Sequence, residues 1–162
     1  MLAPPSRLAI EPLEFRIERF PHVAKELPEL FKAHWNEVSP YRHKASLKPN
    51  FDQYFSLDRM GALWGFTARY ESVLVGYLAF IVANNMYHQE KTADGNVFYM
   101  MPAFRSGWNA VKFLKFAEQV LKEEKVKFVN LECTVDFDLS PIFKYLGYKP
   151  TFTTHIKYLG DG

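Results

Sequence analysis

The sequence predicts a single domain of mixed α and β structure (α+β or α/β), because segments that alternate every second residue are interspersed with segments of helical spacing. The chain has 162 residues, and 48% of them are apolar, which is enough to build one full core. Aromatic residues make up 17%, an excess that indicates a thick core or an aromatic-lined groove. Residues 1–12 contain three prolines, so we expect an N-terminal arm followed by one domain over residues 13–162.

Alternation predicts the first strand over residues 13–20. A helix follows over residues 28–38, where Pro28 suits the first turn and the apolar side chains share one face. Residues 39–61 are expected to form a loop that contains one short helix over residues 51–60.

Two alternating segments, residues 63–70 and 73–83, predict a hairpin, and the second is apolar on both faces and therefore central in the sheet. A polar loop is expected over residues 84–95, followed by a strand over residues 96–101. Residues 109–125 form the strongest amphipathic helix, with alanine, valine, leucine and phenylalanine on one face and charges on the other.

The remaining elements are a strand over residues 128–135, a short helix over residues 140–145 and a last strand over residues 152–159. Cys133 falls on the apolar face of its strand and is expected to be a buried small hydrophobe. The order is therefore strand, helix, short helix, three strands, helix, strand, helix, strand, without an internal repeat.

Composition excludes several classes of function. Lys and Arg total 20 against 18 Asp and Glu, a balance that argues against a dedicated nucleic-acid binder. The single cysteine excludes an internal disulfide and fits a reducing cytoplasm. We see no signal peptide, and the longest apolar run, residues 73–83, is far shorter than the roughly 20 residues that span a bilayer. We therefore expect a cytoplasmic protein without a nucleic-acid or membrane partner.

The segment NVFYMMPAFRSGWNAVKFLKFAE carries the clearest chemical signal. A strand ends at a proline, a short loop with Gly107 follows, and an amphipathic helix begins. Unpaired N–H groups at such a helix start suit an anion such as a pyrophosphate, and Arg105 can add a charge-assisted hydrogen bond. A plain connection between strand and helix is the alternative.

Three motifs resemble the GCN5-related N-acetyltransferase (GNAT) family. MMPAFRSGWNA at 100–110 matches the family pattern V-x-P-x-[FY]-[QR]-x-x-G-x-[GA], SPIFKYLGY at 140–148 matches a short helix that ends in L-G-[FY], and VLVGYLAF at 73–80 matches the third strand. AHWNEV and the long loop after it are further similar to the acetyltransferases of bacteriophages and their hosts.

The resemblance implies a mixed central sheet of about six to seven strands, splayed between the fourth and fifth, with helices on both faces. It also implies acetyl-CoA as co-substrate, direct attack of an amine on the thioester, and no metal. The pantetheine arm would pair with the backbone of Met100 and Met101. The residues implied to hold the pyrophosphate are Arg105, Ser106, Gly107, Trp108, Asn109 and Ala110.

The sequence departs from the family pattern at three positions. Trp108 replaces a glycine, and Gly107 just before it is expected to absorb the tight turn. Phe143 replaces the tyrosine that protonates the leaving thiolate in many members. Asn96 replaces a carboxylate base, and an amide cannot take a proton at neutral pH.

Other polar residues are therefore weighed for catalysis. Glu132, on the polar face of its strand, is a candidate for binding the amine or accepting its proton, as are Glu37 and the loop residue Asp94. His34, Glu90 and Asn96 are candidates for contacting the acceptor. The competing interpretation is a solvated strand face for Glu132, solvated charges for the other carboxylates, and a satisfied, half-buried histidine for His34. The five histidines have no metal-ligand spacing.

Two classes of function follow. The first is an acetyl-CoA-dependent N-acetyltransferase for a primary amine, either a small molecule or a protein lysine or N-terminus. The second is a catalytically degenerate GNAT-fold protein of the phage type that captures a host protein. The chain would act as a monomer or a homodimer in either case.

Overall fold

The structure, a computed structural model, describes residues 12–160 of the chain, without the side chain of Asn96. The predicted arm thus lies outside the described residues, apart from Pro12. The elements, in chain order, are β1 (Glu14–Ile17), α1 (Phe20–Val23), α2 (Leu27–Val38), α3 (Phe51–Arg59), β2 (Leu63–Tyr70), β3 (Val73–Asn84), β4 (Lys91–Met100), the 3₁₀ turn η1 (Pro102–Phe104), α4 (Asn109–Glu123), β5 (Phe128–Leu131) and α5 (Ser140–Tyr145).

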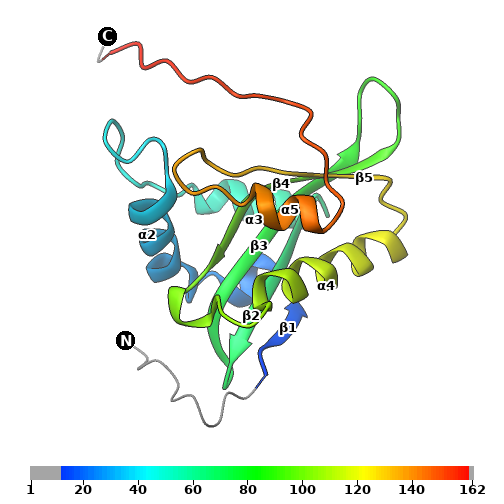
Figure 1. Ribbon diagram of the computed structural model, residues 1–162, viewed down its shortest axis with the longest axis horizontal. Helices are drawn as coiled ribbons and strands as arrows, with labels where there is room; N and C mark the ends of the chain where they lie inside the picture. Colours follow the sequence, from blue (N-terminus) through cyan, green and yellow to red (C-terminus); the bar gives the residue numbers. More distant parts are fainter. Residues whose placement is uncertain (1–11, 161–162) are drawn as a thin grey trace.

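The strands form one mixed sheet in the order β1-β2-β3-β4-β5. All neighbours are antiparallel except β4 and β5, which run parallel because α4 carries the chain back to the same end of the sheet. Figure 1 shows α4 and α5 in front of the sheet, with α2 beside it. This arrangement confirms the predicted fold class. Within residues 12–160, no helix is both long and apolar enough to cross a bilayer.

Two hydrophobic clusters pack the two faces of the sheet. On one face, α4 and α5 cover residues of β2, β3 and β4, and Phe66, Leu78 and Phe113 are almost completely buried there. On the other face, α1, α2 and α3 cover Leu74, Tyr77 and Tyr99. Many of the chain's aromatic residues lie in these clusters, so much of the aromatic excess serves the core.

Two strand boundaries differ from the prediction. β4 begins at Lys91 rather than residue 96, because the polar segment Lys91–Gly95 pairs with the end of β3 and with β5. β5 ends at Leu131 rather than residue 135. Beyond that point the chain turns away and Cys133 is exposed, so its predicted burial is wrong. The extension of β4 to Lys91 could not be predicted from side-chain alternation, because its residues are mostly polar and backbone pairing does not require apolar residues.

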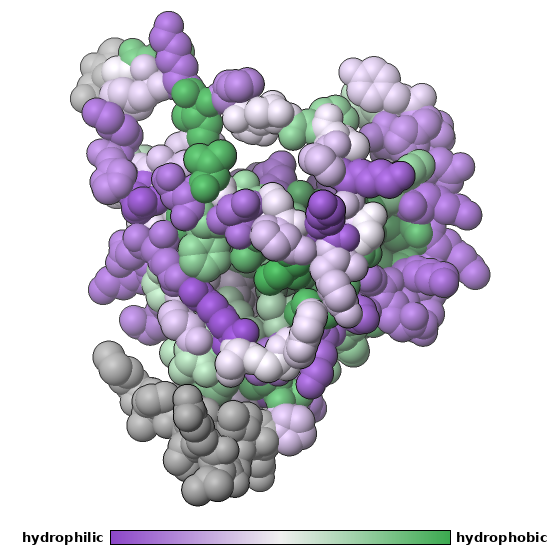
Figure 2. All heavy atoms as spheres, in the orientation of Figure 1, coloured by the Kyte–Doolittle hydropathy of each residue, from purple (hydrophilic) through white to green (hydrophobic). Residues whose placement is uncertain are grey.

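The predicted strand over residues 152–159 is not formed. This segment leaves α5 as extended chain and joins no strand of the sheet (Figure 1). Phe152 is 91% and Leu159 85% exposed, and apolar side chains are visible along this segment in Figure 2. The described part of the chain therefore has five strands instead of the expected six or seven. A strand-like sequence forms a strand only where a neighbouring edge receives its backbone groups.

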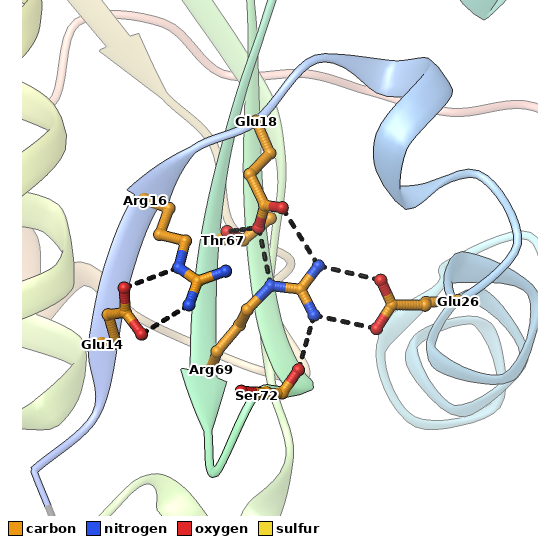
Figure 3. A network of polar contacts seen from close by, with 7 residues as sticks. All are labelled: Glu14, Arg16, Glu18, Glu26, Thr67, Arg69 and Ser72. Atoms are coloured by element: carbon orange, nitrogen blue, oxygen red, sulfur yellow. Dashed lines mark hydrogen bonds and ion pairs between the residues drawn. The ribbon is translucent and has the colours of Figure 1, made fainter.

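A buried arginine ties β1 and the start of α2 to the sheet (Figure 3). The Arg69 side chain is 6% exposed, and its guanidinium donates to both carboxylate oxygens of Glu18 and both of Glu26, at 2.7–3.2 Å. Thr67 also donates to Glu18. Burial opposes ionisation of Glu18, but the hydrogen bonds from Arg69 and Thr67 outweigh it, so the pKa of Glu18 lies below its usual value.

We predict that Arg69→Ala lowers the free energy of unfolding by about 3 kcal/mol, because it leaves the half-buried Glu18 carboxylate without its cation. Arg16→Ala is the matched control. Among the described residues Arg16 pairs with the exposed Glu14 alone, so its loss should cost much less than that of Arg69. Urea unfolding at pH 7 measures both. Equal losses in the two variants would contradict the role assigned to Arg69.

Candidate functional site

The two parallel strands separate in the middle of the sheet. β4 and β5 are paired only from Thr92 with Phe128 to Gly95 with Leu131. At this point the register of β3 against β4 also shifts, which leaves Asn96 as the extra residue of a β-bulge. Beyond the bulge, residues 97–100 have β3 on one side and no strand on the other. The expected splay between the fourth and fifth strands is present.

A polar pocket lies where the strands begin to separate. Its lining residues are Asp94, Gly95, Asn130 and Glu132. Asp94 and Asn130 are opposite each other in the register, and the Asn130 amide donates to the Asp94 carboxylate at 2.6 Å. Glu132 follows two residues after Asn130. Two carboxylates that were candidates for proton transfer are therefore brought to one pocket.

The loop after β4 leaves several backbone amides open. Gly107 and Trp108 are both left-handed, with φ of +65° and +67°, so the turn is not absorbed by Gly107 alone as the sequence suggested. Among the described residues, no acceptor is bonded to the amides of Ser106, Gly107 or Trp108, nor to those of the first α4 turn at Ala110 and Val111. A β-carbon built on Gly107 would have nothing within 4 Å. The loop is thus an uncovered array of N–H donors.

Arg105 is turned inward from this loop. Its Nε donates to the Met100 carbonyl oxygen at 2.7 Å, and its two terminal nitrogens donate to the Glu37 carboxylate at 2.6 and 2.9 Å. The guanidinium also lies over the rings of Tyr99 and Phe137, at 5.3 and 5.1 Å from their centroids. Arg105 therefore connects the end of β4 with α2 and with the segment after β5.

Glu37 and His34 form a second polar cluster one helical turn apart on α2. Glu37 also accepts a hydrogen bond from the Tyr99 hydroxyl at 3.0 Å, and the bonds from Arg105 lower its pKa. His34 Nδ1 lies 2.6 Å from the Tyr77 hydroxyl, and its ring stacks on Tyr99 at 4.9 Å. Burial lowers the pKa of His34 to about 4, so the imidazole is neutral at pH 7.

The predicted site residues thus fall into separate groups. Asp94 and Glu132 share the polar pocket, whereas His34 and Glu37 lie near the far end of β4. Asp94 and Tyr99 are five positions apart on β4, which places these groups roughly 15 Å apart along the strand. Glu90 precedes β4, beyond the part that borders the splay. Met100 is buried, and Ser106, Gly107 and Trp108 are exposed.

Three residues of these groups were not identified from the sequence as site residues. Tyr77 and Tyr99 had only the pattern of core side chains, and Asn130 had only a place on a polar strand face. The parallel register that sets Asn130 against Asp94 was the missing information. Phe143 is 8% exposed and packs on Tyr148, so it is part of the core. Within residues 12–160, no group of three His, Cys, Asp or Glu side chains could hold a metal ion.

Comparison with solved structures identifies the fold. An aminoglycoside acetyltransferase from an uncultured soil metagenomic sample, in complex with sisomicin, matches with a TM-score of 0.71 and 17% identity over 92% of this chain and 97% of that chain. A ribosomal-protein-alanine N-acetyltransferase from Brucella melitensis biovar Abortus matches with a TM-score of 0.71 and 12% identity over 92% and 100%.

A predicted acetyltransferase with acetyl-CoA from Clostridium acetobutylicum matches with a TM-score of 0.63 and 15% identity over 91% and 96% of the two chains. The chain therefore has the fold of the GCN5-related N-acetyltransferases. No family model matches the sequence, and no curated protein matches it.

The low pKa of His34 predicts a pH dependence of stability. The unfolded chain binds a proton near pH 6.5 while the folded chain does not, so the free energy of unfolding should fall as pH falls from 6.5 to 4.5, by up to about 1.4 kcal/mol per pH unit. His34→Phe should remove this component. Urea unfolding of the wild type, His34→Phe and the exposed control His43→Phe at pH 4.5, 5.5 and 6.5 measures it. A wild-type slope in His34→Phe would show that His34 is not the group responsible.

Proposed function

We propose that the chain is an acetyl-CoA-dependent N-acetyltransferase that acts on a primary amine. The observation that carries this proposal is the open side of β4 beyond Gly95, which has a carboxylate pocket at one end and an uncovered loop of amides at the other. The fold shared with known acetyltransferases supports it.

The residues present fit acetyl-CoA. The backbone of residues 97–100 has hydrogen-bonding groups without a strand partner on the side of the splay, which suits the amide-containing pantetheine arm, as does the half-buried Met101 at the start of the loop. The amides of Ser106, Gly107, Trp108 and the first α4 turn are placed to donate to a pyrophosphate, with Asn109 and Ala110 continuing the same turn. The co-substrate supplies an acetyl group activated as a thioester.

Asp94 and Glu132 are assigned the acceptor amine. Both side chains are exposed and lie where β4 and β5 separate, so a cationic amine can be held there by charge-assisted hydrogen bonds. One of the carboxylates first takes a proton from the bound ammonium, directly or through water, which frees the lone pair that attacks the thioester; the second proton, lost as the amide forms, passes to water. Asn130 orients Asp94 by its 2.6 Å hydrogen bond.

Water returns the proton to the leaving thiolate in this scheme. Phe143 occupies the expected position of the acid, but its ring is buried and has no proton to donate. Tyr145, two residues later, stands on the exposed side of α5 with Trp108, so it does not replace a residue that points into the core.

Glu37 and Arg105 are assigned positioning roles. Glu37 is bonded to Arg105 and Tyr99 and has a lowered pKa, which makes it a weak proton acceptor. Arg105 uses its guanidinium donors within the chain, so its contribution to phosphate binding is to hold the loop rather than to contact the phosphate. His34, which is bonded to Tyr77 and stacked on Tyr99, is assigned to the wall of the acceptor face.

A second candidate function is capture of a protein partner by a GNAT fold that no longer catalyses. The exposed apolar side chains of residues 152–159 favour it, because exposed apolar segments are typical of interaction sites. Calorimetry with acetyl-CoA, followed by assay of a panel of polyamines, aminoglycosides and lysine peptides, separates the two. Binding without any turnover would support the second.

We predict that Gly107→Glu weakens CoA binding by at least tenfold, because it sets a negative charge beside the pyrophosphate. Gly107→Gln is the matched control, since it has the same size and the same left-handed backbone strain without the charge. Isothermal titration calorimetry with CoA should place Gly107→Gln between the wild type and Gly107→Glu. Similar affinities for the two variants would refute an anion site at this loop.

We predict that Asp94→Asn or Glu132→Gln lowers turnover by roughly 100-fold, the usual scale of general base catalysis. Glu90→Gln, a carboxylate outside the pocket, should keep wild-type turnover. Steady-state assays on a confirmed acceptor measure this, with CoA affinity as a check on folding. Wild-type turnover in both pocket variants would place proton transfer elsewhere.

A further inference from the structure

Two exposed aromatic rings lie against each other beside the open loop. Trp108 is 61% and Tyr145 60% exposed, and their ring centroids are 5.1 Å apart at an angle of 45°. They come from different elements, since Trp108 precedes α4 and Tyr145 ends α5. Large aromatic side chains are usually covered, so an exposed pair that converges from two helices is a feature to explain.

The conformation of Trp108 is not explained by stability. Its backbone is left-handed, with φ +67° and ψ 11°, a region that disfavours any residue with a β-carbon. Its side chain does not cap α4, and most of its surface is in solvent. A glycine would adopt this turn without strain. Backbone strain that is not offset by packing of the side chain is typical of functional positions.

A lysine also lies close to the tyrosine. The Lys115 ammonium is 5.7 Å from the centroid of Tyr145, and Lys115 is on the same helix that Trp108 precedes. The site therefore combines, next to the loop, a donor array for a diphosphate, two aromatic faces and one cation. A nucleotide has the same sequence of groups: diphosphate, purine base and, in CoA, a 3′-phosphate on the ribose.

We propose that Trp108 and Tyr145 form a stacking platform for the adenine ring of CoA, with Lys115 close to the 3′-phosphate. This inference rests on the proposed function, because it needs the pyrophosphate at residues 106–111. Bases stack on aromatic side chains through their π faces, and a lysine binds phosphate as a point charge. The platform gives the protein affinity for the nucleotide end of the co-substrate, which the strand backbone cannot contact.

The decisive variant is Trp108→Gly, which removes the ring and suits the left-handed turn. Its affinity for CoA should fall about tenfold, and Tyr145→Ala should have a similar effect. The affinity of both variants for 4′-phosphopantetheine, which lacks the adenosine, should stay within twofold of wild type. Tyr87→Ala is the control, because Tyr87 is 97% exposed and belongs to the turn between β3 and β4. Calorimetry measures all of these affinities, and quenching of tryptophan fluorescence by CoA but not by 4′-phosphopantetheine gives a second readout.

The cation is tested with dephospho-CoA. Lys115→Ala should lose affinity for CoA but not for dephospho-CoA, whereas Lys122→Ala at the far end of α4 should bind both as wild type does. Equal wild-type affinity for CoA and 4′-phosphopantetheine, or unchanged or tighter CoA binding by Trp108→Gly, overturns the platform while the proposed function stands. A wild-type protein that binds neither CoA nor 4′-phosphopantetheine overturns both.

Discussion

The end of pairing between β4 and β5 is the constraint on which the site depends. Peptide groups inside a sheet must be hydrogen-bonded, and a strand that loses its neighbour leaves a row of donors and acceptors. Here the loss occurs in the middle of the sheet, after Gly95 and Leu131, rather than at its edge. Gly95 permits the close packing at this point, because a β-carbon there would lie 2.5 Å from the Phe80 ring. The chain thus places unsatisfied backbone beside a well-packed core.

Arg105 fixes the elements on either side of the gap between β4 and β5 relative to each other. Its bonds to the Met100 carbonyl and to Glu37, together with the rings of Tyr99 and Phe137, join β4, α2 and the segment after β5. Hydrogen bonds between charged groups are about twice as strong as neutral ones, and a bidentate pair also fixes an angle. The guanidinium donors of Arg105 are thus used inside the chain, on a backbone carbonyl and a carboxylate.

Much of the fold could be predicted from the sequence, because side-chain periodicity reports burial directly. The helices over Leu27–Val38 and Asn109–Glu123 and the hairpin of β2 and β3 follow from it. The extension of β4 to Lys91 and the absence of a strand over 152–159 depend on which backbones meet, and periodicity has no information on that. Within the site, the loop at 105–110 was predicted from its motif. The pairing of Glu37 with Arg105, residues 68 positions apart, was not, since neither residue has a local partner that marks it.

Glu37 differs from the pocket carboxylates Asp94 and Glu132 in its contacts and not in its chemistry. These contacts are the reason for assigning Glu37 a positioning role and the other two a catalytic role. Glu37 is bonded by an arginine and a tyrosine, so its negative charge is already compensated and its pKa is lowered. Among the described side chains, Asp94 has a single donor, the Asn130 amide, and Glu132 shares its pocket without an arginine or lysine in the lining. Uncompensated carboxylates attract a cationic amine, whereas a compensated one has little charge left to offer. The acceptor amine is therefore expected at the end of the splay next to Gly95, where the thioester of a co-substrate lying along residues 97–101 would also end.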